Sequence, residues 1–120
     1  MNQEEHNTQC AIFRWVETEI VRHPELAFMF STLNGVRLTI GTAKKAKAAG
    51  NKKGVPDIWL PVKRGICSGL VIELKREIGG VVSKEQKEWL AFLNDQGFKA
   101  VVRRGFIAAI TEIQNYLTGV

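Results

Sequence analysis

The 120-residue chain has only two cysteines and no long apolar run, and each shortage excludes a class of protein. No apolar stretch approaches the roughly 18 residues that cross a bilayer, so we expect no transmembrane helix. Cys10 and Cys67 are isolated and form no CxxC pair, which argues against structural zinc and against a disulfide framework. The first ten residues are polar and partly acidic, unlike a signal peptide. We therefore expect a cytoplasmic protein with no membrane partner.

Acidic residues are the minority among the charged side chains and are absent from one stretch. The chain carries 17 Lys and Arg against 12 Asp and Glu, a formal net charge of +5, which favours a polyanionic partner. Residues 44–53, KKAKAAGNKK, hold five lysines and no acid. Both a solvated helix and a phosphate-binding surface have this composition, so composition alone leaves the two alternatives open.

The spacing of apolar residues predicts a mixed α/β domain without internal repeats. Asn34-Gly35 is a turn signal, and Ser83 with Gln86 fits a capping box. No shift in composition marks a boundary, so we expect one domain over residues 1–120. The strands at 57–60 and 69–75 are expected to form a hairpin. In full, we expect helices at 4–22, 42–49, 84–96 and 106–117, strands at 26–33, 57–60, 69–75 and 98–104, and a short strand or extended segment at 36–40.

The segment GLVIELK, residues 69–75, places two charged residues at the end of an apolar strand. Residues two apart in a strand face the same side, so Glu73 and Lys75 share one face. Asp57 opens the partner strand, and pairing would bring it close to Glu73. Two close carboxylates repel unless a proton or a cation such as Mg²⁺ lies between them. On these segments alone, the commoner interpretation is an ion pair between Glu73 and Lys75, with Asp57 as a turn residue.

Three further polar residues lie on the inward-facing stripes of helices. Glu5 and Gln9 precede Phe13 by eight and four residues, so they extend the apolar stripe that Phe13 begins. Gln86 lies three residues before Trp89 and faces inward by the same spacing. Each alone would be an exposed residue at a helix end. Together they predict a polar cluster at one end of the core.

Taken in order, these segments resemble the VRR-NUC family, a branch of the PD-(D/E)xK nuclease superfamily, and most closely its small stand-alone phage and bacterial members. The matching segments are PELAFMF followed by Asn34-Gly35, the lysine-rich residues 43–53, GVPDIWLPV, GLVIELK and SKEQKEWL. One departure is Val36, where the family often has a second glycine or other small residue. The resemblance implies a restriction-endonuclease-like core, a mixed β-sheet flanked by helices, in a bacterial cell or phage-infected host.

The resemblance also implies hydrolysis of phosphodiester bonds with Mg²⁺ or Mn²⁺. Asp57 and Glu73 would bind the metal, with the backbone carbonyl of Leu74 as a further ligand. Lys75 would contact the attacking water and the scissile phosphate. The resemblance assigns two supporting roles and one weaker candidate: Glu5 would join the acidic cluster directly or through a water, Gln86 would hold the water or the Lys75 amine, and Gln9 would lie behind them.

The partner implied by the resemblance is DNA, and branched DNA such as four-way junctions or flaps, cut by a homodimer. A nuclease of broader specificity for duplex or single strands is one alternative. A DNA-binding module without catalysis is another, and the presence of Asp57, Glu73 and Lys75 argues against it. The residues that would contact the DNA backbone are Lys44, Lys45, Lys47, Lys52 and Lys53, with Arg37, Arg103 and Arg104 as less supported candidates.

Overall fold

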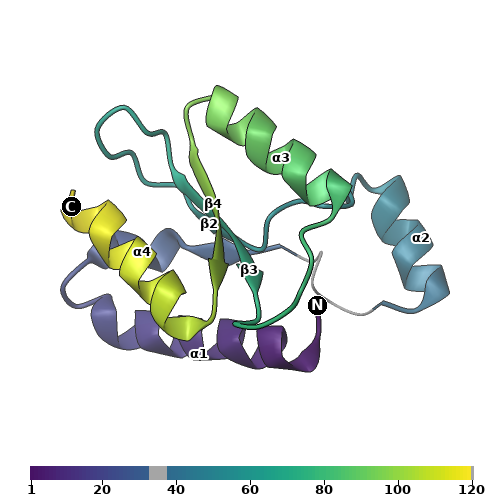
Figure 1. The fold of residues 1–120 in the computed structure, drawn as a ribbon, viewed down its shortest axis with the longest axis horizontal. Coiled ribbons are helices and arrows are strands. Elements are labelled where there is room, and N and C mark those ends of the chain that lie inside the picture. The colour runs from purple at the N-terminus through teal and green to yellow at the C-terminus, as the bar shows by residue number, and fades with distance from the viewer. Residues whose placement is uncertain (33–37, 120) are drawn as a thin grey trace.

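The computed structural model describes residues 1–32 and 38–119 and shows a mixed four-stranded sheet flanked by helices (Figure 1). The predicted fold class, α/β with helices around a mixed sheet, is therefore confirmed. The strands lie in the order β1 (Phe30–Ser31), β2 (Ile58–Leu60), β3 (Leu70–Lys75) and β4 (Lys99–Arg104). The helices are α1 (Gln3–Glu19), α2 (Ile40–Ala48), α3 (Lys84–Asp95) and α4 (Phe106–Thr118), with a 3₁₀ turn η1 (Pro24–Phe28).

The two faces of β3 belong to two apolar layers. Leu70, Ile72 and Leu74 pack in the larger cluster, which α1 and α4 supply from one side of the sheet. Val71 packs with Leu93 of α3 on the other side, and Figure 1 shows α3 opposite α1 and α4. Each fully buried aliphatic side chain contributes about 1.5–3 kcal/mol. These layers hold β3 in the middle of the protein, with all six of its residues buried.

The pairing of the strands agrees with the predicted hairpin. β2 and β3 run antiparallel, and Ile58 pairs with Ile72. β3 and β4 run parallel and are joined by α3. A parallel pair needs a crossover connection, because a tight turn cannot bring the second strand back in the same direction. The carboxyl end of β3 and the start of α3 consequently lie on either side of one connecting loop, residues 76–82.

One predicted strand is wrong. The apolar run at 26–33 contains most of η1 and only the two-residue strand β1. Pro24 explains the difference, because its fixed φ suits the first position of a helical turn. Leu26 is buried from this turn, and Met29 directly after it, so the run still reaches the core. The turn at Asn34-Gly35, Arg37 and part of the segment 36–40 lie outside the described residues.

The remaining elements are confirmed, with small differences at their ends. α1 begins at Gln3 and ends at Glu19, short of the predicted residue 22, because the chain turns ahead of Pro24. α2 starts earlier than predicted, because Thr39 acts as its N-cap and accepts the Thr42 amide at 3.2 Å. Within the described residues, no helix combines the length and the apolar character needed to cross a membrane.

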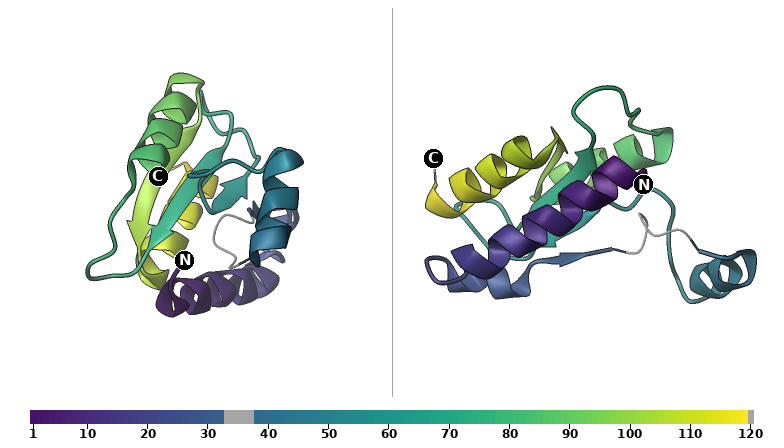
Figure 2. Two further views of the ribbon diagram at one scale, coloured as in Figure 1. Left: turned by 90° about the vertical axis from the view of Figure 1, so that its right-hand side faces the viewer. Right: turned by 90° about the horizontal axis from the view of Figure 1, so that it is seen from below.

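The short helix α2 stands apart from the layers just described. None of its residues is buried. Figure 2 shows it beyond the amino-terminal end of α1, outside the helices that cover the sheet. Its lysines are exposed, and no ion pair within the described residues involves Lys44, Lys45, Lys47 or Lys52. A helix that buries no apolar face gains no stability from packing.

Candidate active site

The hairpin delivers Asp57 to the end of β3. Pro56 has no backbone N–H, and the β2 ladder stops at Ile58. The Leu74 amide, which would otherwise continue the ladder, donates instead to Oδ2 of Asp57 at 2.8 Å. Asp57 is thereby held opposite Glu73, one position beyond the last pair of the ladder. The structure confirms the predicted proximity of the two carboxylates.

Lys75 and Glu73 lie on the face of β3 that is turned toward α3. Nζ of Lys75 is 3.7 Å from Oε2 of Glu73, with the two side chains 10% and 2% exposed. The ion pair expected from the sequence pattern is therefore present. It lies on a central strand next to Asp57, not at an exposed strand edge, so it does not account for the second carboxylate.

The first turn of α3 supplies Gln86 to the same place. Ser83 and Gln86 form the predicted capping box: Oγ of Ser83 accepts the Gln86 amide at 3.1 Å, and Oε1 of Gln86 accepts the Ser83 amide at 2.8 Å. Nε2 of Gln86 then donates to Oε2 of Glu73 at 3.1 Å. Because Oε1 faces an N–H donor, the cap fixes the amide with its NH₂ group toward the carboxylate.

The amino-terminal turn of α1 supplies Glu5, which is buried. Its carboxylate accepts the Asn2 amide at 3.4 Å in a second capping box and the Arg76 amide at 3.1 Å. The second of these bonds ties the helix to the chain directly after β3. With both oxygens engaged by backbone N–H groups, Glu5 is suited to an indirect contact with a cation through water.

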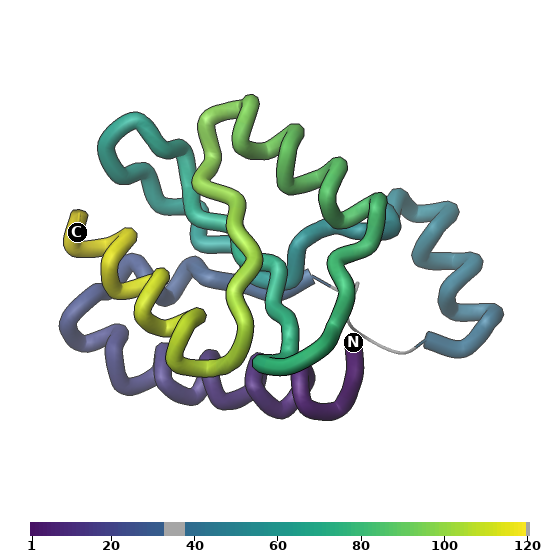
Figure 3. Tube along the Cα trace, viewed as in Figure 1, coloured from purple at the N-terminus to yellow at the C-terminus, as the bar shows by residue number. Residues whose placement is uncertain are grey.

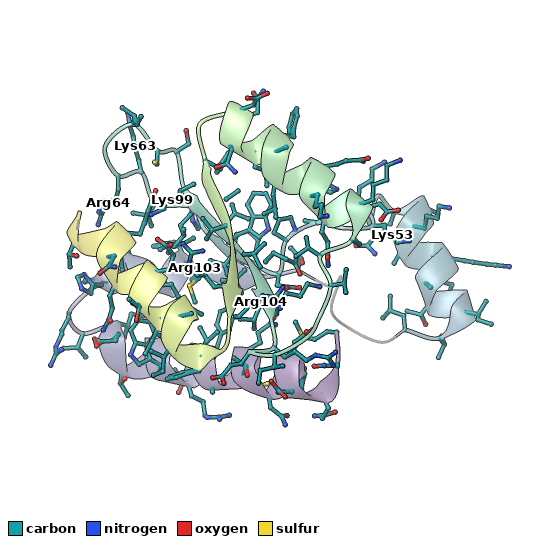
Figure 4. All side chains as sticks on the ribbon, viewed as in Figure 1. Lys53, Lys63, Arg64, Lys99, Arg103 and Arg104 are labelled. Atoms are coloured by element: carbon teal, nitrogen blue, oxygen red, sulfur yellow. The ribbon has the colours of Figure 1, made fainter. Side chains whose placement is uncertain are left out.

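These side chains line one cavity of about 280 Å³. Gln9 is half-buried, and it is absent from the described residues that line the cavity. Lys53 stands at the mouth, 80% exposed, with Nζ 3.7 Å from a carboxylate oxygen of Glu85. Figure 4 shows it where α2 approaches the start of α3. The structure thus brings together six of the predicted residues: Glu5, Lys53, Asp57, Glu73, Lys75 and Gln86.

The cavity disfavours negative charge on Asp57 and Glu73. Burial, followed by the charge of Asp57 and a hydrogen bond with it, raises the pKa of Glu73 from 4.5 to about 9. Burial also raises the pKa of Asp57, against the opposing effects of its bonds with Glu73 and the Leu74 amide. The Lys75 ammonium lowers both pKa values, and it does not outweigh burial. The carboxylate pair therefore holds a proton at neutral pH unless another cation replaces it.

The donor set fits a hard divalent cation. Oε1 of Glu73 is buried and has no hydrogen-bond partner among the described residues, a costly arrangement for a carboxylate oxygen. Carboxylate oxygens are the preferred ligands of Mg²⁺, which keeps several of its own waters. In residues 1–32 and 38–119, no three His, Cys, Asp or Glu side chains are grouped so as to hold a metal. An ion here would rest on Asp57, Glu73, backbone oxygen and water.

The predicted DNA-contacting arginines are separated by the alternation of β4. Arg103 lies on the face toward α4, and there, with Lys99, it pairs with the buried carboxylate of Glu112. Arg104 lies on the opposite face, in register with Lys75. Figure 4 shows Arg103 and Lys99 beside α4 and Arg104 at the end of β4. Arg103 is thus engaged inside the fold.

The sequence interpretation missed the packing role of Gly54. It has φ +88°, and a Cβ there would lie 2.7 Å from both C and Cβ of Glu85. The loop before Asp57 therefore touches the first turn of α3, which carries Gln86. A glycine three residues before the aspartate, at the end of a lysine-rich stretch, was the signal in the sequence.

Replacing the buried carboxylate of Glu73 is expected to stabilise the metal-free protein. A carboxyl group whose pKa is higher in the folded state favours folding while protonated, so stability falls as the pH rises from about 4.5 to about 9. Glu73→Gln should remove most of this slope and raise the free energy of unfolding at pH 8 by roughly 1–3 kcal/mol. Urea unfolding in EDTA from pH 5 to 9 measures it, with the exposed Glu88→Gln as control. The prediction would be contradicted if the wild-type protein had the same free energy of unfolding at pH 5 and at pH 9.

Two carboxylates, a lysine and a glutamine thus share one cavity at the end of a mixed sheet that helices flank. The chain belongs to the VRR-NUC domain family, whose model matches residues 1–106. A solved structure described as a VRR_NUC domain protein is 27% identical, with a TM-score of 0.79 over 98% of this chain and 91% of that chain. A search of curated proteins finds no significant match. The family assigns the chain a nuclease-type, DNA-processing function.

Proposed function

We propose that the chain is an endonuclease that hydrolyses DNA phosphodiester bonds with Mg²⁺ or Mn²⁺ and prefers branched DNA. The observation that carries the proposal is the buried carboxylate pair of Asp57 and Glu73, with Lys75 beside it and one oxygen of Glu73 unpartnered. A purely structural ion pair would need one carboxylate. The second carboxylate accepts the Leu74 amide through one oxygen, and a cation would offset the cost of burying it beside Glu73.

Asp57, Glu73 and the backbone carbonyl of Leu74 would hold the metal, and Glu5 would reach it through water. Bound there, the metal supplies charge neutralisation for the phosphate and a lowered pKa for a coordinated water. The Lys75 ammonium is placed to orient the attacking water and to offset the negative charge that develops on the phosphate. Gln86 keeps a second N–H beyond its bond to Glu73, with which it can hold the water or the substrate.

The test is a cleavage assay on junction, flap, duplex and single-stranded DNA with Mg²⁺, Mn²⁺ or EDTA. We expect cleavage with either metal, none in EDTA, and faster cleavage of the branched forms. Lys75→Ala should abolish it in a protein that remains folded by circular dichroism. Undiminished cutting in EDTA would refute the metal mechanism. Equal cutting of all four DNAs would support the broader-specificity alternative, and metal-independent binding without cutting would support the non-catalytic one.

Lys44, Lys45 and Lys47 are proposed to bind the DNA backbone, together with Lys52 and Lys53. Each phosphate contact steepens the dependence of log K on log salt concentration by about 0.9. Changing the three lysines of α2 to Gln should therefore reduce the slope by roughly 2–3 and weaken all DNA forms alike.

A matched control removes the same charge elsewhere, with the changes Arg14→Gln, Arg22→Gln and Lys63→Gln at three exposed positions. Figure 4 shows Lys63 in the β2–β3 loop, at the end of the protein opposite Lys53. The control triple variant should keep most of the wild-type slope. Equal effects of the two triple variants would show that net charge, and not α2, sets the binding.

The proposal includes a homodimer, in which two cavities would face the two strands of a branched substrate. Membership of the family supports the homodimer. Light scattering at several protein concentrations measures the molar mass. A monomer that still cuts both strands of a junction would remove the dimer from the proposal.

A further inference from the structure

The loop between β3 and α3, residues 76–82, carries two aliphatic side chains in solvent. Ile78 is 86% exposed and Val81 is 85% exposed. The residues that flank the loop, Lys75 and Ser83, both line the cavity. Figure 3 shows the segment crossing the amino-terminal turns of α1 before it rises to α3. Scattered exposed aliphatic residues need no explanation, whereas two on one short loop beside the site call for a closer look.

The loop is held in place by polar contacts on its inner side. The Arg104 guanidinium donates to the carbonyls of Arg76 at 3.4 Å, of Gly80 at 3.1 Å, and of Gly79. Glu5 accepts the Arg76 amide. Gly79 and Gly80 both have positive φ, 78° and 67°, which forms the tight turn at the tip. Ile78 and Val81 are thus presented by a fastened turn, and no fraying of the chain accounts for their exposure.

The surroundings of the loop favour nucleic acid as the occupant. Glu77, the one acid of the loop, turns toward the start of α4, where a Cβ on Gly105 would lie 2.6 Å from its Cγ. The segment from Ile78 to Ser83 carries no charge, and Lys84 follows it, exposed. A DNA strand with one phosphate at Lys75 would pass close to this uncharged loop, because the loop directly follows Lys75 in the chain. In an intact duplex the base faces are stacked on one another, and aliphatic side chains gain contact only where stacking is broken.

We propose that Ile78 and Val81 form an apolar wedge that packs against an unstacked base next to the scissile phosphate. The wedge would make the cavity select DNA with an interrupted helix, and this inference rests on the proposed DNA substrate. Selection arises from contact with the exposed base face, so it carries little dependence on base identity. Arg104 would position the loop through its hydrogen bonds to the loop carbonyls.

The test uses the double variant Ile78→Ser, Val81→Ser in an Asp57→Asn protein, so that DNA stays uncut. The probe is 2-aminopurine placed at the first unpaired position of a flap, or in the middle of a paired duplex. We expect binding to raise the fluorescence at the flap position, and the double variant to lose this change and to bind the flap roughly tenfold more weakly. Affinity for the paired duplex should stay within about twofold.

The control is Val21→Ser, Ile66→Ser, two aliphatic residues exposed by 84% and 96% at other places on the surface. In the Asp57→Asn background, this control should show the same fluorescence response and the same flap affinity as the Asp57→Asn protein itself. Equal weakening of flap and duplex, or an unchanged fluorescence response, would overturn the wedge. The wedge would also be overturned if the double variant had a lower molar mass than the parent protein and an unchanged affinity for DNA. That result would mean that Ile78 and Val81 contact a second copy of the chain. The nuclease proposal is tested separately, because it fails if the protein that retains Asp57 does not cleave DNA.

Discussion

Asp57→Asn is expected to lower metal-dependent DNA cleavage by roughly 10³-fold, which corresponds to about 4 kcal/mol of transition-state stabilisation. The change removes one of two carboxylates that would share the cation, while the Asn carbonyl can still accept the Leu74 amide that Oδ2 accepts now. The fold should therefore persist, and the loss should be chemical. Single-turnover cleavage of flap DNA at saturating Mg²⁺ measures the rate, and Mn²⁺ titration by calorimetry measures the metal affinity.

The matched control is Asp95→Asn, at the exposed end of α3. It should leave both the rate and the metal affinity unchanged. A rate for Asp57→Asn within tenfold of wild type, or an unchanged Mn²⁺ affinity, would show that Asp57 is not a metal ligand. Glu73→Gln is the companion variant to Asp57→Asn. The negative charge of the Glu73 carboxylate lowers the stability of the metal-free protein, and the proposed metal site requires that charge.

Gly54→Ala is expected to destabilise the protein by roughly 2–4 kcal/mol, from backbone strain and overpacking together. At φ +88° the new Cβ would meet Glu85 at 2.7 Å and the Gln86 amide at 2.9 Å. Because these are backbone or near-backbone atoms, the start of α3 must move away from Asp57. The bond from Gln86 to Glu73 should lengthen, and cleavage should fall with stability. Urea unfolding and the same single-turnover assay measure the two effects.

Gly50→Ala separates the two causes. Gly50 has φ +104°, and a Cβ there meets nothing within 4 Å. It should show the backbone strain alone, of the order of 1 kcal/mol, with cleavage unchanged. If the two variants lost the same stability and activity, the contact between the loop and α3 would have no part in positioning Gln86.

The sequence predicts those parts of the site that depend on short-range periodicity. The period of two along β3 places Glu73 and Lys75 on one face, and the hairpin carries Asp57 opposite Glu73. The capping box at Ser83 fixes Gln86 in a single orientation. In each case local geometry and tertiary structure agree, so a pattern of a few residues was sufficient.

The rest depends on contacts between distant segments. Gln9 shares the stripe of Glu5, yet it lies about 6 Å further along the helix, away from the cavity. Arg103 and Arg104 are adjacent in sequence, and only the register with Lys75 shows which of them faces the site. Gly54 reads as an ordinary turn residue until its approach to α3 is seen. Hydrophobic spacing carries no information on any of these.

The hydrogen bond between Glu5 and the Arg76 amide joins residues 71 positions apart, and the bond between Gln86 and Glu73 depends on α3. The site therefore does not exist in any fragment of the chain that lacks either end of this span. A truncation that removes α1 or α3 is therefore expected to leave the carboxylate pair without its neighbour Glu5 or without Gln86.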